Sequence, residues 1–414
     1  MIVIEHIGTL AGVRQQKGGA PLRGNDLRDL PVLNDAWLAI KNGRIHSFGS
    51  MQMPFGEDAL KHDAKGGFVI PAWVDSHTHI VFAASREQEF VDRINGMSYQ
   101  EIAARGGGIL NSAARLRSCS EDELFLSATE RLLELVSLGT GAIEIKSGYG
   151  LSAESELKML RVIKKLSAVS PIPVRSTFLG AHALPAEFRD NRRAYVDMLV
   201  FELLPQIASE QLADYIDVFC ESGFFTVDET IRLIEEGAKR GLKAKIHTNQ
   251  FNMLGGIEAA VSRGALSVDH LEVLNDGEIE TLAMGNTIAT LLPTAPFFLR
   301  DPYQPARKLL DAGVAVALAS DYNPGSSPSG NMNFVCSLAC IALRMTPEEA
   351  VNAATWNGAC ALELQDEVGA IAPGMRANII ITRPMPDIAY LPYAFGSNQI
   401  REVWMNGQPF RATL

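Results

Sequence analysis

The sequence predicts an α/β protein: a (β/α)8 TIM-like barrel with a small composite β-sandwich domain formed by the N- and C-terminal segments. Three observations lead to this prediction. From about residue 69 to 365, short apolar runs alternate with helical periodicity, which is typical of repeated βα units. Both ends of the chain instead alternate in the manner of β-strands. Five histidines and one aspartate fall at or just past the ends of candidate barrel strands.

The two ends of the chain are predicted to form one β domain from residues 1–68 and 366–414, with the barrel at 69–365. Each end carries an Asn-Gly pair, Asn42-Gly43 and Asn406-Gly407, between strand-like runs. Asn-Gly is favoured in two-residue hairpin turns. A chain of 414 residues also exceeds what one compact core usually organises, which favours one large and one small domain.

Seven candidate barrel strands are marked by short apolar runs. They are 68–74, 141–146, 174–179, 242–247, 265–270, 287–292 and 314–320. Helix starts between them are well marked, with capping boxes at Ser120 and Thr226 and a proline after Thr346. The eighth strand is expected in the stretch before the glycines at 106–108. Those glycines lack the lysine of a phosphate loop and are interpreted as a flexible segment over the pocket.

Charge and composition narrow the class of partner. A formal net charge of −11 repels both a phosphate backbone and an anionic membrane surface, so no nucleic acid and no membrane partner is expected. No apolar run approaches the roughly 18 residues of a membrane span. The five cysteines are odd in number and scattered, which indicates buried thiols in a reducing compartment. The protein is expected to be cytoplasmic and to act on a small molecule.

The strand-end residues predict a metal site. His77 and His79 lie two positions apart after an apolar run, so both rings can reach one ion. With His247 and Asp321 they provide three imidazoles and one carboxylate with room for water, which suits Zn²⁺ or Fe³⁺ used hydrolytically. Such an ion lowers the pKa of its bound water, and Asp321 can move the proton to a leaving nitrogen. His270 is expected to polarise the carbonyl under attack.

The order of these residues resembles the amidohydrolase superfamily, with His-x-His on the first barrel strand, histidines on the fifth and sixth, and aspartate on the eighth. Further matching motifs are 82–86, 144–150, 178–182 and 320–326, and the resemblance covers nearly the whole chain. The chain is most similar to members that act in histidine degradation. They hydrolyse the ring amide C–N bond of 4-imidazolone-5-propanoate to N-formimidoyl-L-glutamate. The resemblance implies metal ligands His77, His79, His247 and Asp321, and a homodimer.

The resemblance also assigns substrate contacts to Arg86, Tyr149, His182, Gln250, Asn323, Gly325 and Ser326. Arg86 can fork a propanoate carboxylate, and the turn at 323–326 is expected to offer backbone N–H groups to a carboxylate. Family members carry glutamate or glutamine at position 250. Gln250 is predicted to take part in catalysis as well as in substrate binding. It can hydrogen-bond a ring nitrogen but cannot act as a base.

Two alternatives stay open. Another cyclic-amide hydrolase or a heterocycle aminohydrolase of the same superfamily would share the metal ligands, but its substrate would not need a carboxylate anchor at Arg86. A noncatalytic metal- or ligand-binding barrel is disfavoured, because binding alone does not need the acid–base groups of His270 and Asp321. Some superfamily members carbamylate a strand lysine to bridge two metals. The place of Lys146 in a Lys-Ser-Gly-Tyr-Gly turn favours one metal.

Overall fold

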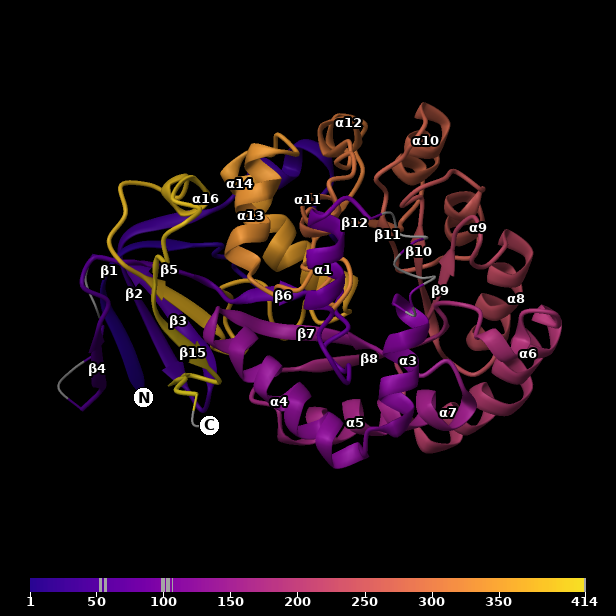
Figure 1. Ribbon diagram of the computed structural model, residues 1–414. Coiled ribbons are helices and arrows are strands. Elements are labelled where there is room, and N and C mark those ends of the chain that lie inside the picture. The colour runs from indigo at the N-terminus through magenta and orange to yellow at the C-terminus, as the bar shows by residue number, and fades with distance from the viewer. Residues whose placement is uncertain (52–53, 56–57, 98–100, 102–104, 106, 413–414) are drawn as a thin grey trace.

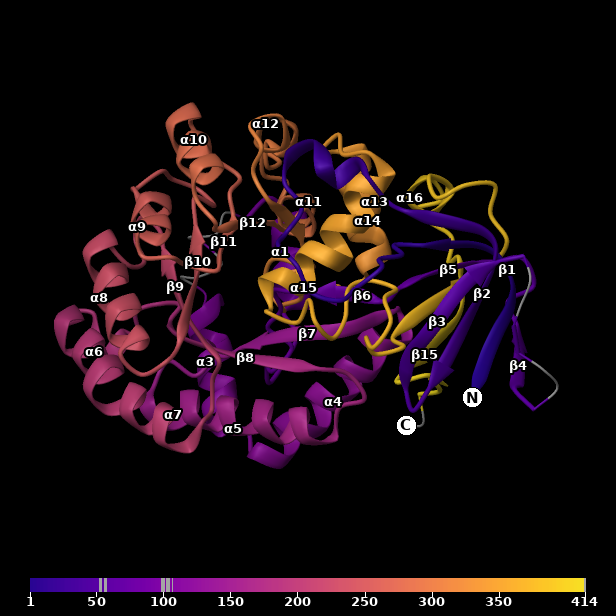
Figure 2. The same ribbon diagram turned by 180° about the vertical axis from the view of Figure 1, so that it is seen from behind.

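The protein is described by a computed structural model that covers residues 1–414 apart from 52–53, 56–57, 98–100, 102–104, 106 and 413–414. Among the described residues the strands form two eight-stranded sheets. One sheet is built from both ends of the chain, and the other is a barrel with helices packed around its outside (Figures 1 and 2). The predicted barrel with a β domain made from both termini is confirmed.

The terminal sheet interleaves strands from the two ends of the chain. Its strand order is β16-β15-β14-β5-β1-β2-β3, with β4 paired to β1. The strands are β1 (Ile2–Ala11), β2 (Val32–Lys41), β3 (Arg44–Ser50), β4 (Leu60–Asp63), β5 (Phe68–Pro71), β14 (Ile379–Thr382), β15 (Ile400–Met405) and β16 (Gln408–Pro409). Asn42-Gly43 and Asn406-Gly407 close the β2–β3 and β15–β16 hairpins with positive φ at all four residues, as a type I′ turn requires.

The barrel strands are parallel and follow one another in chain order. They are β6 (Trp73–Asp75), β7 (Thr140–Lys146), β8 (Val174–Ala181), β9 (Tyr215–Cys220), β10 (Lys243–Thr248), β11 (Ser267–His270), β12 (Ile288–Leu291) and β13 (Val316–Leu318). Most of their side chains are buried, because the barrel interior and the outer helices cover both faces. A parallel bridge between Thr78 and Tyr322, just past β6 and β13, joins the first strand to the last.

Two strand predictions were wrong. The run at 68–74 is split, because Phe68–Pro71 pairs with β1 and β14 in the terminal sheet and only Trp73–Asp75 enters the barrel. The barrel strand expected before Gly106 is instead Tyr215–Cys220, the fourth in chain order, which pairs with β8 and β10. Asp217 interrupts the apolar pattern of this run, so the run was not predicted to be a strand. Much of the stretch before Gly106, and Gly106 itself, lies outside the described residues.

Most of the helices lie on the outer face of the barrel (Figures 1 and 2). They are α1 (Glu87–Ile94), α3 (Ile109–Ser118), α4 (Glu121–Ser137), α5 (Ala153–Val169), α6 (Arg192–Met198), α7 (Leu204–Glu210), α8 (Val227–Ala238), α9 (Gly256–Ser262), α10 (Asp276–Met284), α11 (Thr294–Leu299), α12 (Ala306–Asp311), α13 (Met332–Ile341), α14 (Pro347–Asn352), α15 (Gly358–Ala361) and α16 (Tyr390–Tyr393), with short turns η1 (Gly24–Arg28), η2 (Ala186–Phe188), η3 (Leu199–Leu203) and η4 (Ala353–Asn357). The capping boxes predicted at Ser120 and Thr226 are formed, and α14 begins with the predicted proline, Pro347, after a capping box at Thr346. Across the described part of the chain, no helix has the length and apolar character needed to cross a membrane.

Asn378 joins the terminal sheet to the barrel. Its Nδ2 donates to the carbonyl oxygen of Gly141 in β7 at 2.9 Å, and its Oδ1 accepts from the N–H of Asn406 at 2.8 Å. The side chain is buried. Asn378→Ala would leave two backbone groups unpaired at this junction, so we expect the free energy of unfolding to fall by about 2–4 kcal/mol.

Urea unfolding measures this loss. Asn398→Ala is the control, because Asn398 is exposed and its side chain caps only the nearby N–H of Ile400. We expect the control to change stability by less than about 0.5 kcal/mol. Equal stability of the two variants would contradict the role of Asn378 at the junction.

Candidate metal centre and active site

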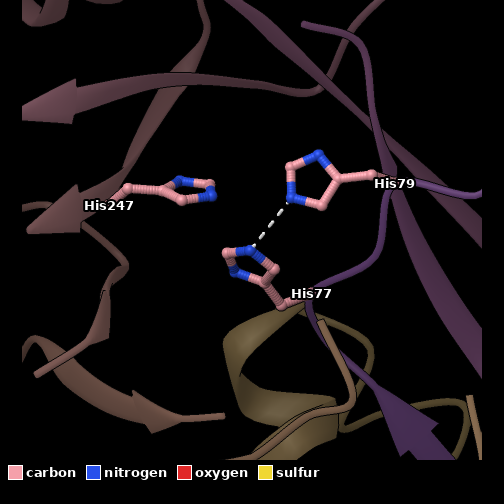
Figure 3. Close-up of side chains that lie close together, drawn as sticks. All are labelled: His77, His79 and His247. Atoms are coloured by element: carbon pink, nitrogen blue, oxygen red, sulfur yellow. Dashed lines mark hydrogen bonds between the residues drawn. The ribbon is translucent and has the colours of Figure 1, made fainter. Parts of the chain in front are cut away.

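Three histidines converge at the carboxyl ends of the barrel strands. His77 and His79 follow β6, His247 belongs to β10, and their rings point toward one another (Figure 3). The Nε2 atoms of His77 and His79 are 3.3 Å apart, and each lies 3.5 Å from Oδ1 of Asp321. All four side chains are buried. The structure therefore brings together the four residues predicted to hold a metal.

Two aspartates set the orientation of these rings. Asp269 accepts a hydrogen bond from Nδ1 of His77 at 2.7 Å, and Asp217 accepts one from Nδ1 of His247 at 2.8 Å. Because a carboxylate only accepts, the proton lies on Nδ1 and the Nε2 lone pair faces the centre. Burial, followed by the positive charge of Lys146 and of neighbouring rings, holds the pKa of His77 and His247 well below the usual range.

These features fit a metal ion. Neutral imidazoles with Nδ1 bound to a carboxylate and Nε2 directed at a common point are the usual form of histidine ligands. Lone pairs on nitrogens 3.3 Å apart repel each other unless a cation lies between them. The residues that would hold the ion are His77, His79, His247 and Asp321.

Asp321 is held firmly at its position. Its N–H donates to the carbonyl oxygen of His77 at 3.0 Å, and the Ser326 hydroxyl donates to its Oδ2 at 3.2 Å. Asp75 accepts from the N–H and hydroxyl of the preceding residue, Ser320, at 3.0 and 2.5 Å. Asp321 has a φ of 53°, a conformation that residues other than glycine rarely adopt and that is enriched at active sites. Burial raises the pKa of Asp321 to about 6.

His270 lies beside the three histidines and is backed by a carboxylate. Its ring centroid is 5.2 Å from that of His247, and its Nδ1 is 3.3 Å from Oε1 of Glu272. Gln304 donates to the same oxygen at 2.9 Å. Burial alone would lower the pKa of His270, but the Glu272 carboxylate, with further acidic neighbours, raises it to about 9. A protonated His270 can polarise a carbonyl, which is the role predicted for it.

Replacing Glu272 should change the pH dependence of catalysis. A group with a raised pKa keeps its proton up to that pH and loses it above, so activity that needs the His270 cation falls as pH rises through its pKa. In Glu272→Gln the pKa of His270 should fall toward its ordinary value of about 6.5. We expect the alkaline limb of the kcat profile to move to lower pH by about one unit or more. An alkaline limb at the same pH in both proteins would exclude a cationic role for His270.

A cavity of about 1150 Å³ lies beside the candidate metal ligands, because its lining residues His182 and Ser326 contact His79 and Asp321. The residues expected to contact substrate all line it: Arg86, Tyr149, His182, Gln250, Asn323, Gly325 and Ser326. The ring of His182 stacks on His79 with a centroid distance of 5.6 Å, and the ring of Tyr149 lies edge-on to both. Two residues of the cavity wall are therefore in direct contact with His79, a candidate metal ligand.

Arg86 is positioned before any substrate binds. Its guanidinium pairs with Glu89, one turn further along the chain, and Glu89 also accepts from the N–H of Gly108 at 2.9 Å. Gly325 makes room for it, since a Cβ at that position would collide with the guanidinium. Arg86 thus lines the cavity with its guanidinium held in place, and such a group can bind a carboxylate.

The turn at 323–326 corrects one prediction. The N–H groups of Gly325 and Ser326, expected to bind a carboxylate, both donate to Oδ1 of Asn323, at 2.7 and 2.8 Å. Asn323 thereby folds its own turn, as asparagine often does. Its Nδ2 donates to the carbonyl oxygen of Asp321 and to the Ser326 hydroxyl, each at 2.7 Å. The turn holds Asp321 in place instead of offering free N–H donors.

The segment that carries Gln250 is tethered by a buried carboxylate. Glu221 accepts from the N–H groups of Phe251 and Asn252 at 2.9 and 3.2 Å. Sequence reasoning missed this tether, as it missed Asp217 and Asp269. For the two aspartates a signal was present, since a lone carboxylate within a buried strand needs a partner.

Comparison with known proteins identifies the family of this chain. The family model described as Amidohydrolase family matches residues 68–409, and the chain belongs to that family. It is 53% identical over 408 residues to an imidazolonepropionase of Christiangramia forsetii, which covers 98% of this chain and 99% of the relative. An imidazolonepropionase of Flavobacterium johnsoniae is 53% identical over 407 residues, with the same coverage. Within the amidohydrolases the chain therefore groups with the imidazolonepropionases.

Solved structures support the fold. A guanine deaminase from C. acetobutylicum, solved with bound guanine in its active site, matches with a TM-score of 0.71. The match covers 99% of this chain and 100% of that one, at 16% identity. At that identity the likeness concerns the architecture of barrel and terminal sheet alone.

Proposed function

We propose that this chain is a metal-dependent hydrolase that cleaves the ring amide C–N bond of 4-imidazolone-5-propanoate and yields N-formimidoyl-L-glutamate in histidine degradation. The observation that carries the proposal is a cavity whose wall touches the site of the four candidate metal ligands. Its lining residues His182 and Ser326 contact His79 and Asp321, and the same wall carries Arg86, held by Glu89. A metal-assisted hydrolysis and a carboxylate anchor together match this substrate. The names of the relatives point to the same reaction.

Different residues of the chain carry out the separate steps of hydrolysis. When bound, Zn²⁺ or Fe³⁺ supplies Lewis acidity and lowers the pKa of a coordinated water. Asp321 accepts the proton of the attacking water and delivers it to the ring nitrogen as the C–N bond breaks. The His270 cation donates a hydrogen bond to the ring carbonyl oxygen, where negative charge develops. The water oxygen ends in the new carboxylate, one of its protons on the ring nitrogen, and the other is released to solvent as the new carboxyl group ionises.

The remaining cavity residues bind and orient the substrate in this proposal. The Arg86 guanidinium binds both oxygens of the propanoate carboxylate. Tyr149 and His182 line the wall next to His79 and contact the ring of the substrate. Gln250 hydrogen-bonds a ring nitrogen without exchanging a proton. Asn323, Gly325 and Ser326 act mainly by holding Asp321 and Arg86, and the Ser326 hydroxyl is the group of this turn that reaches the reacting atoms.

One metal ion per chain fits the site better than two. Nζ of Lys146 lies 2.8 Å from Oε1 of Glu144 and 2.9 Å from Oδ2 of Asp217. Burial alone would lower the pKa of Lys146, but Asp217, Glu144 and Asp269 raise it above its ordinary value. A protonated amine cannot be carbamylated to bridge a second metal. Zn²⁺ and Fe³⁺ both suit three nitrogens and one oxygen.

Hydrolysis of freshly prepared substrate tests the proposal. Purified, metal-loaded protein is mixed with newly generated imidazolonepropanoate, and the decay of substrate and the formation of N-formimidoyl-L-glutamate are followed together. We expect decay well above the spontaneous rate, with matching product. Decay at the spontaneous rate would overturn the proposal.

We also propose that the protein works in the cytoplasm as a homodimer. None of its five cysteines forms a disulfide, which suits a reducing compartment. The dimer rests on the family resemblance. Sedimentation at working concentration should give twice the 44.9 kDa mass of one chain, and a monomer mass would contradict it.

A further inference from the structure

A buried cluster of charges lies beneath the metal-binding histidines and is centred on Lys146. Its Nζ is 2.8 Å from Oε1 of Glu144, 2.9 Å from Oδ2 of Asp217 and 3.8 Å from Oδ2 of Asp269. All four side chains are almost wholly inaccessible to solvent. Burying charges is costly, and removing one partner from such a cluster leaves the others uncompensated. The function of Lys146 therefore depends on the groups that its partner carboxylates bind in turn.

Two of those partners are the carboxylates that orient metal ligands. Oδ2 of Asp217 lies 2.8 Å from Nδ1 of His247 while it also accepts from Lys146. Oδ2 of Asp269 lies 2.7 Å from Nδ1 of His77. A single ammonium thus contacts the carboxylates behind two ligands that come from different strands of the barrel.

We propose that Lys146 is a positioning residue of the metal site. Its ammonium holds Asp217 and Asp269 so that they accept from Nδ1 of His247 and His77 and turn both Nε2 lone pairs toward one metal ion. Lys146 occupies the place between acidic groups that a second cation would otherwise take. The inference rests on the metal site of the proposed function and adds a residue that does not touch the metal or the substrate.

Lys245 provides a matched control. It is equally buried, in β10, and its Nζ donates to the carbonyl oxygens of Ser76 and Ala361 at 3.1 and 3.4 Å. It lies 3.4 Å from Oε2 of Glu144. Among the ion pairs of the described residues, Lys245 has none with Asp217 or Asp269. Lys245→Met therefore removes a buried charge without releasing the two carboxylates.

The test measures zinc affinity without substrate. Metal-free wild type, Lys146→Met and Lys245→Met compete with a fluorescent chelator for Zn²⁺ at neutral pH, and urea unfolding of each apoprotein reports folding. We expect Lys146→Met to raise the Kd for Zn²⁺ by about 10- to 100-fold, and Lys245→Met by about threefold or less. Lys146→Arg, which keeps the charge, should recover part of the loss.

If Lys146→Met does not fold, a second pair of variants tests whether Lys146 positions the metal ligands. Asp217→Asn and Asp269→Asn keep the shape and an acceptor oxygen but lose the charge that pairs with Lys146. Each should weaken zinc binding about tenfold. Wild-type affinity in the folded lysine or aspartate variants, or an equal loss in Lys245→Met, would overturn the inference. A protein that shows the expected zinc affinities but does not hydrolyse imidazolonepropanoate would overturn the proposed function alone.

Discussion

Asp321→Asn should lower kcat for imidazolonepropanoate hydrolysis by about 10³-fold or more. Asparagine keeps the shape and one oxygen at this position but cannot accept a proton from the attacking water. The pKa of Asp321, raised to about 6 by burial, is suited to both taking and returning a proton near neutral pH. The buried position beside His77 and His79 leaves bulk water little access to replace this function.

The experiment compares kcat and metal content in the same preparations. Ser326→Ala serves as the control, because Ser326 donates a hydrogen bond to Oδ2 of Asp321 without being a proton carrier. We expect that variant to lose about tenfold or less. If Asp321→Asn carries a full complement of metal and loses less than about tenfold in kcat, proton transfer belongs to another residue.

Arg86→Gln should raise KM about 10- to 100-fold and change kcat much less. A hydrogen bond to a charged group contributes about 1.5–3 kcal/mol, and about 1.4 kcal/mol corresponds to a tenfold change in affinity. The guanidinium is held by Glu89 and by the space that Gly325 leaves, so it is oriented before binding. That preorganisation limits the entropy lost when the carboxylate docks.

Arg93→Gln is the matched control for this prediction. Arg93 belongs to α1, which begins directly after Arg86, lines the same cavity, and donates to the carbonyl oxygen of Gly325 at 3.2 Å. We expect a smaller rise in KM for this variant. An imidazolone that lacks the propanoate chain should be hydrolysed equally by wild type and Arg86→Gln. If Arg93→Gln raised KM more than Arg86→Gln, the carboxylate anchor would be Arg93 and not Arg86.

The convergence of the four candidate metal ligands could be predicted because strand ends are local features. His77 and His79 are two residues apart, and β-strand geometry brings both to one side whatever the rest of the fold does. His247 and Asp321 follow apolar runs in the same manner, and a parallel barrel gathers such ends at one face. Even where bounds shifted, as for β13 (Val316–Leu318), the carboxyl end stayed near the predicted position.

Features that depend on long-range packing could not be predicted. Asp217 in β9 and Asp269 in β11 can orient His247 and His77 only because these strands and the first barrel strand are aligned next to Lys146. The split of the run at 68–74 depends on pairing with strands at both ends of the chain. The turn after Asp321 was misread because the Asn323 side chain competes for the N–H groups, which residue type alone does not reveal.

A single metal ion held by His77, His79, His247 and Asp321 should support hydrolysis. The decisive experiment titrates Zn²⁺ into metal-free protein while bound metal and imidazolonepropanoate hydrolysis are measured together. Activity should be absent without metal, rise in proportion to bound zinc, and level off at one ion per chain. Full activity in the metal-free protein, or a rise that continues to two ions per chain, would exclude hydrolysis supported by one metal ion.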